Sequence, residues 1–211
     1  MCGIAGLIHR GKSSEVGKEL QHMLQALKHR GPDSTGYALY ADNDGQNFIM
    51  RFKVGENVGE GSTSVNEDES VYDSRKKMVD QKLSELGAII VKEERLTPYS
   101  FRYEIKYDKD LMEFSKNIES VEMVEILSIG KSLELIKDLG DAKTVSERYN
   151  LDKVHGTHGI GHARMATESG VDIKSAHPFW GYPFADVSVV HNGQLTNYWN
   201  NRRVLENKGM R

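Results

Sequence analysis

The chain begins Met1-Cys2-Gly3-Ile4-Ala5-Gly6, and Cys2 is the single cysteine among 211 residues. Removal of Met1 would place the thiol of Cys2 beside a free α-amine. An amine with an unperturbed pKa of about 8 can accept the thiol proton near neutral pH. Nucleophile and general base would then belong to one residue. The opening block therefore predicts a nucleophilic cysteine at the start of a short strand over residues 3–8.

The composition limits the classes of function. Lys and Arg number 28 and Asp and Glu 31, so the formal net charge of −3 gives no general attraction to nucleic acid or to an anionic membrane. One cysteine cannot form an internal disulfide, and no early segment combines a basic start with a long apolar run. We therefore expect a cytoplasmic protein that binds neither nucleic acid nor membrane.

Helix and strand signals continue outward from the opening block. An apolar face recurs at helical spacing over residues 15–28, and turn-forming residues follow it. Residues 37–41 and 48–53 predict two strands of a hairpin around Asp42-Asn43-Asp44-Gly45. Residues 55–66 have no apolar period and indicate a linker, so we place a domain boundary after residue 54.

The middle of the chain has its own pattern of elements. Helices are predicted over 71–86, 110–119, 132–139 and 142–149, and strands over 87–92, 99–107 and 123–129. The segment contains neither cysteine nor histidine nor a glycine-rich phosphate loop. We therefore expect residues 55–154 to form an inserted α+β module with a structural or docking role.

Five of the eight histidines lie near the end of the chain, at positions 155, 158, 162, 177 and 191. The first three would share one face of a helix, which is one way to ligate zinc. Three intervening glycines oppose that helix. In an extended segment His155 would point away from His158 and His162. We therefore expect no metal site.

Four further motif blocks follow the opening one in order. They are Arg30-Gly31-Pro32-Asp33-Ser34-Thr35-Gly36, Gly161-His162-Ala163-Arg164-Met165-Ala166-Thr167, Ala176-His177-Pro178-Phe179 and Val190-His191-Asn192-Gly193. Together the five blocks resemble the class II glutamine amidotransferase domain, an N-terminal-nucleophile hydrolase, over residues 1–54 and 155–211. The sequence from His191 to Trp199, together with the long insertion, most resembles the separately encoded amidotransferase subunit of archaeal-type glutamate synthases and their N-methylglutamate synthase relatives.

The resemblance implies an α+β fold, a four-layer αββα sandwich with Cys2 on an edge-accessible strand. It implies that Cys2 attacks the side-chain carboxamide of glutamine, releases ammonia and leaves a γ-glutamyl thioester that water hydrolyses to glutamate. The side chain of Asn192 and the backbone N–H of Gly193 would form the oxyanion hole.

The resemblance also assigns residues to substrate binding. Arg164 would hold the α-carboxylate of glutamine, assisted by Thr167, because a planar guanidinium suits a carboxylate. Arg30 and His177 would support the site. The family acidic residue that binds the α-amine has no counterpart before Arg211, so we expect a sandwich that is incomplete at its C-terminal end.

A partner follows from the same resemblance. Because the sequence contains no recognisable acceptor domain, we expect an ammonia-accepting synthase subunit in a hetero-oligomer. The chain itself would carry no cofactor, and flavin and iron–sulfur centres would belong to that partner. Two alternatives remain open, namely a catalytically silent amidotransferase-like regulatory or binding subunit, and an N-terminal-nucleophile amidase with another amide substrate.

Overall fold

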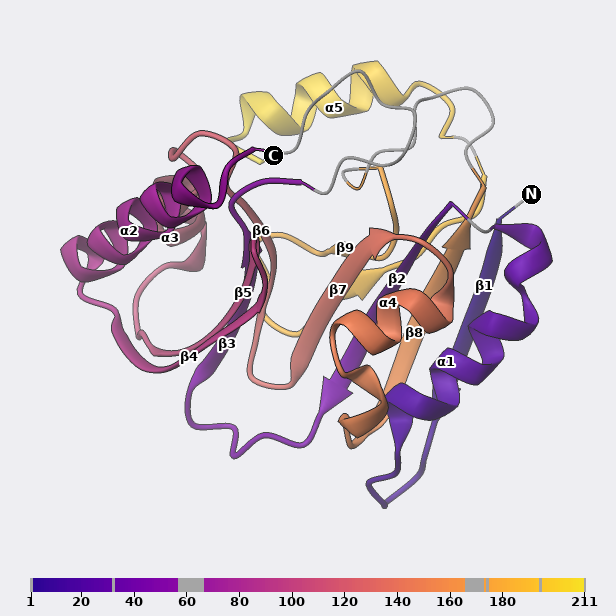
Figure 1. Cartoon of the computed structure of the whole chain (residues 1–211). Helices are drawn as coiled ribbons and strands as arrows, with labels where there is room; N and C mark the ends of the chain where they lie inside the picture. Colours follow the sequence, from indigo (N-terminus) through magenta and orange to yellow (C-terminus); the bar gives the residue numbers. More distant parts are fainter. Residues whose placement is uncertain are drawn as a thin grey trace.

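The computed structural model describes residues 2–31, 33–56, 67–165, 173, 175–193 and 195–210. These residues form a mixed α+β fold with two four-stranded sheets and one two-stranded sheet (Figure 1). In this part of the chain, no helix has the length and apolar character needed to cross a membrane. The α+β class predicted from the sequence is confirmed.

The first sheet lies beside Cys2, the predicted nucleophile, and is called the nucleophile sheet after that prediction. Its strand order is β1-β8-β2-β7, and the strands span Gly3–Ile8, Gly156–Arg164, Ser34–Ala41 and Leu133–Leu139. Helices α1 (Val16–Ala26) and α4 (Ala142–Arg148) pack on one face, where the buried apolar side chains are Val16, Leu20, Leu24, Tyr37, Leu39, Ile136 and Val145. Within the described chain β1 is an edge strand, as the resemblance implied.

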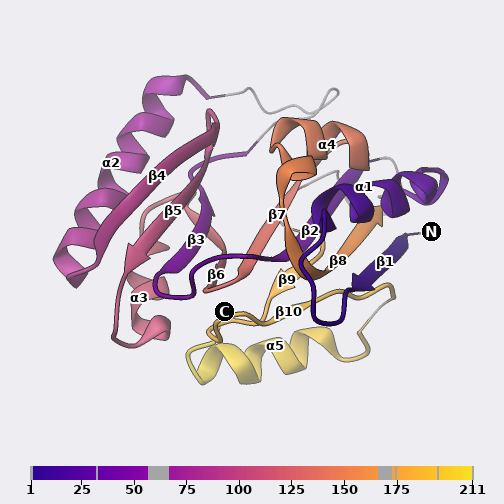
Figure 2. The same ribbon diagram turned by 90° about the horizontal axis from the view of Figure 1, so that it is seen from below.

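The opposite face of the nucleophile sheet is covered by a small sheet of β9 (Phe179–Trp180) and β10 (Ser188–Val189). Trp180 packs in one core with Ala38 and Leu135, and Tyr40 bonds the Ser188 hydroxyl at 2.9 Å. Figure 2 shows α5 (Tyr198–Asn207) beyond this small sheet, on the side away from α1 and α4. This order of helices, sheet, sheet and helix agrees with the αββα layering.

The second large sheet belongs to a unit that spans residues 48–130. Its elements in chain order are β3 (Phe48–Lys53), α2 (Glu69–Leu86), β4 (Ile89–Thr97), β5 (Ser100–Lys106), α3 (Leu111–Ile118) and β6 (Glu125–Gly130). The strand order is β4-β5-β3-β6 with every pair antiparallel, which is the βαββαβ topology of ferredoxin-like folds. Side chains of α2 and α3 share a core with Met50 and Phe52 of β3. We call it the βαββαβ unit.

The limits of this unit differ from the module expected over residues 55–154. The unit begins with β3, whereas β7 and α4 join the nucleophile sheet. The hairpin predicted for residues 37–53 is also wrong, because β2 pairs with β7 and β8 while β3 pairs with β5 and β6. The domain boundary was predicted after residue 54 because the apolar pattern stops there. A loss of apolar pattern does not show that strands before and after that point pair with each other.

The helix predicted over residues 132–139 is wrong as well, since this segment is strand β7. All of Leu133–Leu139 is buried, because one edge of β7 pairs with β2 and the other side packs against the βαββαβ unit. Its three charged side chains have partners: Glu134 binds Arg51, Lys137 binds Glu125 and Asp138 binds Arg148. Because the strand is buried on both faces and its charges are paired, its sequence lacks the alternation of polar and apolar residues that predicts a half-exposed strand.

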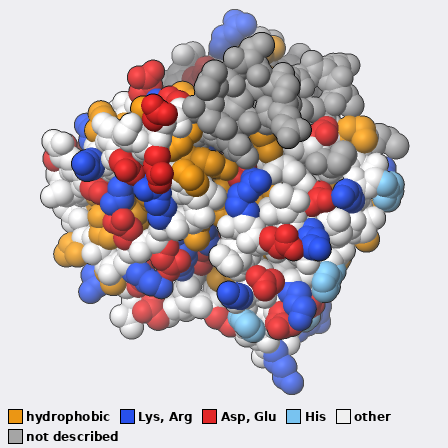
Figure 3. Space-filling model, viewed as in Figure 1, with side chains coloured by type: hydrophobic (Ala, Val, Ile, Leu, Met, Phe, Trp, Pro, Cys, Tyr) orange, Lys and Arg blue, Asp and Glu red, His pale blue; other side chains and the backbone are white. Residues whose placement is uncertain are grey.

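Charges at the surface are mixed. Figure 3 shows basic and acidic side chains interspersed on the face turned to the viewer. Among the described residues on that face the two signs are mixed, which agrees with the small net charge of −3.

Candidate active site

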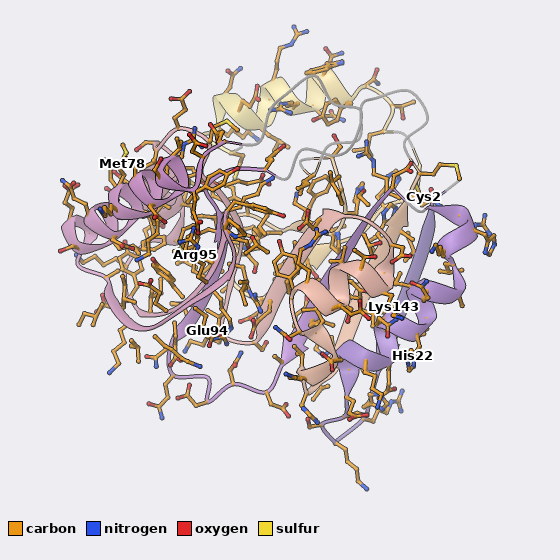
Figure 4. All side chains as sticks on the ribbon, in the orientation of Figure 1. Cys2, His22, Met78, Glu94, Arg95 and Lys143 are labelled. Carbon is orange, nitrogen blue, oxygen red and sulfur yellow. The ribbon has the colours of Figure 1, made fainter. Side chains whose placement is uncertain are left out.

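Cys2 lies directly before β1, at the end of the strand shown in Figure 4. The β1–β8 register pairs Gly3 with Ala163, and its continuation by one residue sets Cys2 opposite Arg164. The Cys2 side chain is partly buried, and its Sγ lies 4.0 Å from the carbonyl oxygen of Met165. Cys2 and Arg164, the predicted nucleophile and the predicted carboxylate-binding residue, therefore lie at the same end of two adjacent strands.

Asn192 reaches Cys2 from the other end of the chain. Its Nδ2 donates a hydrogen bond of 3.0 Å to the backbone carbonyl of Cys2. The route to Asn192 runs through β9 and β10 and is fixed by Asp186, whose Oδ1 accepts bonds of 2.8 Å from the backbone N–H groups of Ser132 and Leu133. These bonds lower the pKa of Asp186 despite its burial. Asn192 is thereby brought to Cys2, and Gly193 follows it in the chain.

The loop that precedes β2 packs behind Arg164. Gly31 approaches the backbone so closely that a Cβ there would lie 2.5 Å from atoms of Ala163 and Arg164. The N–H of Asp33 donates to the Arg164 carbonyl at 3.1 Å. Arg164 is buried, and Arg30 is half-buried at the end of a short 3-10 helix, Lys28–Arg30. Arg30 thus belongs to a loop that holds the backbone of β8 in place.

Three histidines lie close together over the same face. The ring of His177 is 5.0 Å from the ring of His162 and 6.5 Å from that of His191, measured between centroids. The backbone of His177 crosses Gly36, where a Cβ would meet its carbonyl oxygen at 2.0 Å. Burial lowers the pKa of His162 and of His177 to about 4, and nearby positive charges add to the effect. Both rings are therefore neutral at neutral pH.

The histidine pattern does not assemble a metal centre in the described residues. Strand β8 is extended over Gly156–Arg164, and His158 stacks on Tyr40 with ring centroids 3.9 Å apart. In the described residues, no group of three or more His, Cys, Asp or Glu side chains is arranged to hold a metal ion.

Comparison with known proteins connects this geometry to a family. Residues 1–54 match the family model described as a glutamine amidotransferase domain. The chain carries a glutamine amidotransferase domain. The matched residues of this domain include Cys2, α1 and the loop that packs behind Arg164.

Relatives of this amidotransferase domain extend beyond the matched segment. The "Putative glutamine amidotransferase" of Methanothermobacter thermautotrophicus is 38% identical over 217 residues, 99% of this chain and 66% of the relative. The "Glutamine amidotransferase-like protein GlxB" of Rhizobium meliloti is 32% identical over 212 residues, 100% of this chain and 64% of the relative. Amidophosphoribosyltransferase 1 of Arabidopsis thaliana is 38% identical over 80 residues, 37% of this chain and 14% of that protein. The chain spans about two thirds of the length of the first two.

Asn192 is hydrogen-bonded to Cys2, and Arg164 lies on the neighbouring strand β8. Gly193 adjoins Asn192 in the chain, and His177 packs against His162 of β8. Thr167 lies outside the described residues, as does Met1. The sequence did not predict that Asp186 anchors the segment leading to Asn192, because no motif surrounds Asp186. His162 was weighed as a zinc ligand and appeared in a motif block, without a role of its own in the site. The position of His162, two residues before Arg164 on one strand, was the available signal that both share a face.

Proposed function

We propose that this protein is the glutaminase part of an amidotransferase, which hydrolyses L-glutamine to glutamate and ammonia at Cys2. The observation that carries the proposal is the 3.0 Å bond from Asn192 Nδ2 to the carbonyl of Cys2. This hydrogen bond joins a residue of the first motif block to a residue of the last one. The amidotransferase domain match over residues 1–54 supports the same conclusion.

The reaction begins once Met1 is removed and the α-amine of Cys2 is free. The amine accepts the thiol proton, through one water, and the thiolate attacks the side-chain carbonyl carbon of glutamine. Asn192 has two amide N–H groups, so one bonds the Cys2 carbonyl while the other is available to the oxyanion, together with the Gly193 N–H. Each such donor typically contributes about 2.7–4 kcal/mol to transition-state stabilisation.

Collapse of the tetrahedral intermediate expels ammonia, which takes the proton held by the α-amine, and leaves a γ-glutamyl thioester on Cys2. Water then attacks the thioester with the α-amine again as base, and glutamate leaves. Arg164 binds the α-carboxylate of the substrate, with Thr167 assisting. Because His162 and His177 are neutral at neutral pH, they add no positive charge beside the α-ammonium of glutamine.

We further propose that the ammonia passes to a synthase subunit in a cytoplasmic hetero-oligomer, in the first instance a glutamate synthase. Ammonia set free in water becomes protonated and loses its nucleophilicity, so direct transfer favours a bound acceptor. Flavin and iron–sulfur centres would lie in that partner. Full ammonia transfer to 2-oxoglutarate by the isolated polypeptide would contradict the need for a partner.

The decisive experiment is a glutaminase assay on the full-length protein and on Cys2→Ala, each with its intact mass determined. We expect methionine-free protein that releases glutamate from glutamine, and no release by Cys2→Ala. Activity that survives in Cys2→Ala would overturn the proposed nucleophile. A correctly processed wild-type protein without glutaminase activity would favour a silent regulatory subunit, and hydrolysis of N-acyl amides in preference to glutamine would favour an amidase.

A further inference from the structure

Lys137 is a buried lysine on the same face of the nucleophile sheet as the histidine cluster. Gly36 of β2 pairs with Lys137 of β7 on one side and with His162 of β8 on the other, so the three residues form one row across the sheet. The side chain of Lys137 is 3% exposed. A lysine this deeply buried requires partners for its ammonium group.

The first partner of Lys137 belongs to the βαββαβ unit. Its Nζ lies 3.3 Å from Oε1 of Glu125, the first residue of β6. The other carboxylate oxygen of Glu125 lies 3.1 Å from Nζ of Lys53 on β3. Burial lowers the pKa of Lys137, and the charge of Glu125 opposes that change. Glu125 therefore links β7 of the nucleophile sheet to two strands of the βαββαβ unit.

The second partner of Lys137 belongs to the loop that leads to the active site. Its Nζ lies 5.0 Å from the centroid of the Phe179 ring, a distance at which the cation is attracted to the ring. The Phe179 ring meets the His177 ring at 4.4 Å in an edge-on arrangement. Phe179 also opens β9, and the chain continues through β10 to Asn192. Lys137 thus stands between the βαββαβ unit and the segment that delivers the oxyanion donors.

We propose that Lys137 is a positioning residue for glutamine hydrolysis. Held by Glu125, its ammonium fixes Phe179, and Phe179 in turn fixes His177 and the start of the segment that carries Asn192 to Cys2. This inference rests on the proposed glutaminase function and deepens it. It gives the βαββαβ unit a part in the reaction, because a displacement of β6 would move Glu125 and so loosen the site loop.

Two substitutions interrupt the proposed link at different points. Lys137→Met removes the ammonium and keeps the apolar stem, while Glu125 retains Lys53 as its partner. Phe179→Leu removes the aromatic ring. Because Phe179 is 37% exposed, we expect the protein to fold with this substitution. Val189→Ala is the matched control, since Val189 pairs with Phe179 in the small sheet and is 52% exposed.

The readouts are kcat and KM for glutamine, the rate at which the glutamine analogue 6-diazo-5-oxo-L-norleucine labels Cys2, and the thermal midpoint. We expect Lys137→Met and Phe179→Leu each to lower kcat and the labelling rate about tenfold through misplaced oxyanion donors, with KM changed less than about twofold because Arg164 is untouched. Combining them should add little, to about twentyfold at most, since both act through one link. Lys137→Arg should restore kcat to within about threefold of wild type, and Val189→Ala should leave kcat unchanged.

Several outcomes would overturn the inference. A lower thermal midpoint with unchanged kcat in Lys137→Met would show a structural role only, and a double variant reduced about a hundredfold would show two independent effects. If Lys137→Met does not fold, the kcat, the labelling rate and the thermal midpoint of Phe179→Leu and Lys137→Arg decide between the two roles. A wild-type protein that fails to hydrolyse glutamine would refute the proposed function and this inference with it, whereas an active wild type with a fully active Phe179→Leu would refute the inference alone.

Discussion

Glu134 of β7 is the central charge of the contact between the nucleophile sheet and the βαββαβ unit. Its carboxylate accepts hydrogen bonds of 2.9 Å from Arg51 Nε and of 2.9 and 3.0 Å from Nε and Nη2 of Arg102. The side chains of Glu134 and Arg51 are each 5% exposed. We predict that Glu134→Gln strongly destabilises the protein, because it removes the charged partner of the buried Arg51 and leaves Arg102 with Glu94, 3.4 Å away.

The size of this loss follows from the interaction of the buried Glu134 carboxylate with its two arginines. Burial by itself would raise the pKa of Glu134, but Arg51 and Arg102 outweigh burial and lower the pKa from 4.5 to about 2. A lowering of the pKa by this amount corresponds to about 3 kcal/mol of stability. Loss of one partner from a buried ion pair typically costs about 3–5 kcal/mol. We therefore expect Glu134→Gln to lower the free energy of unfolding by about 3 kcal/mol.

Urea denaturation at pH 7, followed by circular dichroism, measures this loss. The matched control is Glu147→Gln, whose side chain is 68% exposed and lies 3.7 Å from Lys143, so we expect a change below about 0.5 kcal/mol. Because the folded-state pKa is depressed, the stabilisation by Glu134 is present above pH 4.5 and is lost as the pH falls toward 2. A loss below about 1 kcal/mol for Glu134→Gln would show that the two arginines do not depend on the charge of Glu134 for stability.

Three further predictions concern the groups around the site. The pKa of His162 is lowered from 6.5 to about 4, so between these pH values the unfolded state binds more protons and the free energy of unfolding falls as the pH drops. His162→Asn should flatten this pH dependence in urea denaturation, and an unchanged pH dependence would contradict the lowered pKa. Gly36→Ala sets a Cβ 2.0 Å from the His177 carbonyl, so the loop must move and labelling of Cys2 should slow by about tenfold or more; wild-type labelling would disprove the close approach. Asp186→Ala leaves three backbone N–H groups of residues 131–133 without their acceptor and should cost about 2–3 kcal/mol in urea denaturation, whereas a loss under about 0.5 kcal/mol would mean that water replaces the carboxylate.

The sequence predicted the elements whose pattern is local. The strand over residues 3–8 is β1, and the helices over 71–86 and 142–149 correspond to α2 (Glu69–Leu86) and α4 (Ala142–Arg148). Each of these helices ends beside turn-forming residues, such as Gly87 with φ of 81° after α2. The motif blocks also predicted that Cys2, Arg164 and Asn192 belong to one site. The structure hydrogen-bonds Asn192 to Cys2 and sets Arg164 on the neighbouring strand, while their roles in a reaction stay predictions.

What the sequence did not predict depends on contacts between distant segments. Strand β7 was predicted as a helix. Its charged residues Glu134 and Lys137 pair with Arg51 and Glu125, which lie elsewhere in the chain and leave no local signal of a buried strand. The βαββαβ unit was cut after residue 54 because the pairing of β3 with β5 and β6 leaves no trace in local composition.

The central claim is that Cys2 is the nucleophile of a glutamine-cleaving site. Its most direct test is the intact mass of the processed protein after treatment with 6-diazo-5-oxo-L-norleucine, followed by mapping of the modified peptide. We expect one adduct on Cys2, protection by excess glutamine, and no adduct on Cys2→Ala. An adduct elsewhere in the chain, or none on a protein whose N-terminal residue is Cys2, would contradict it.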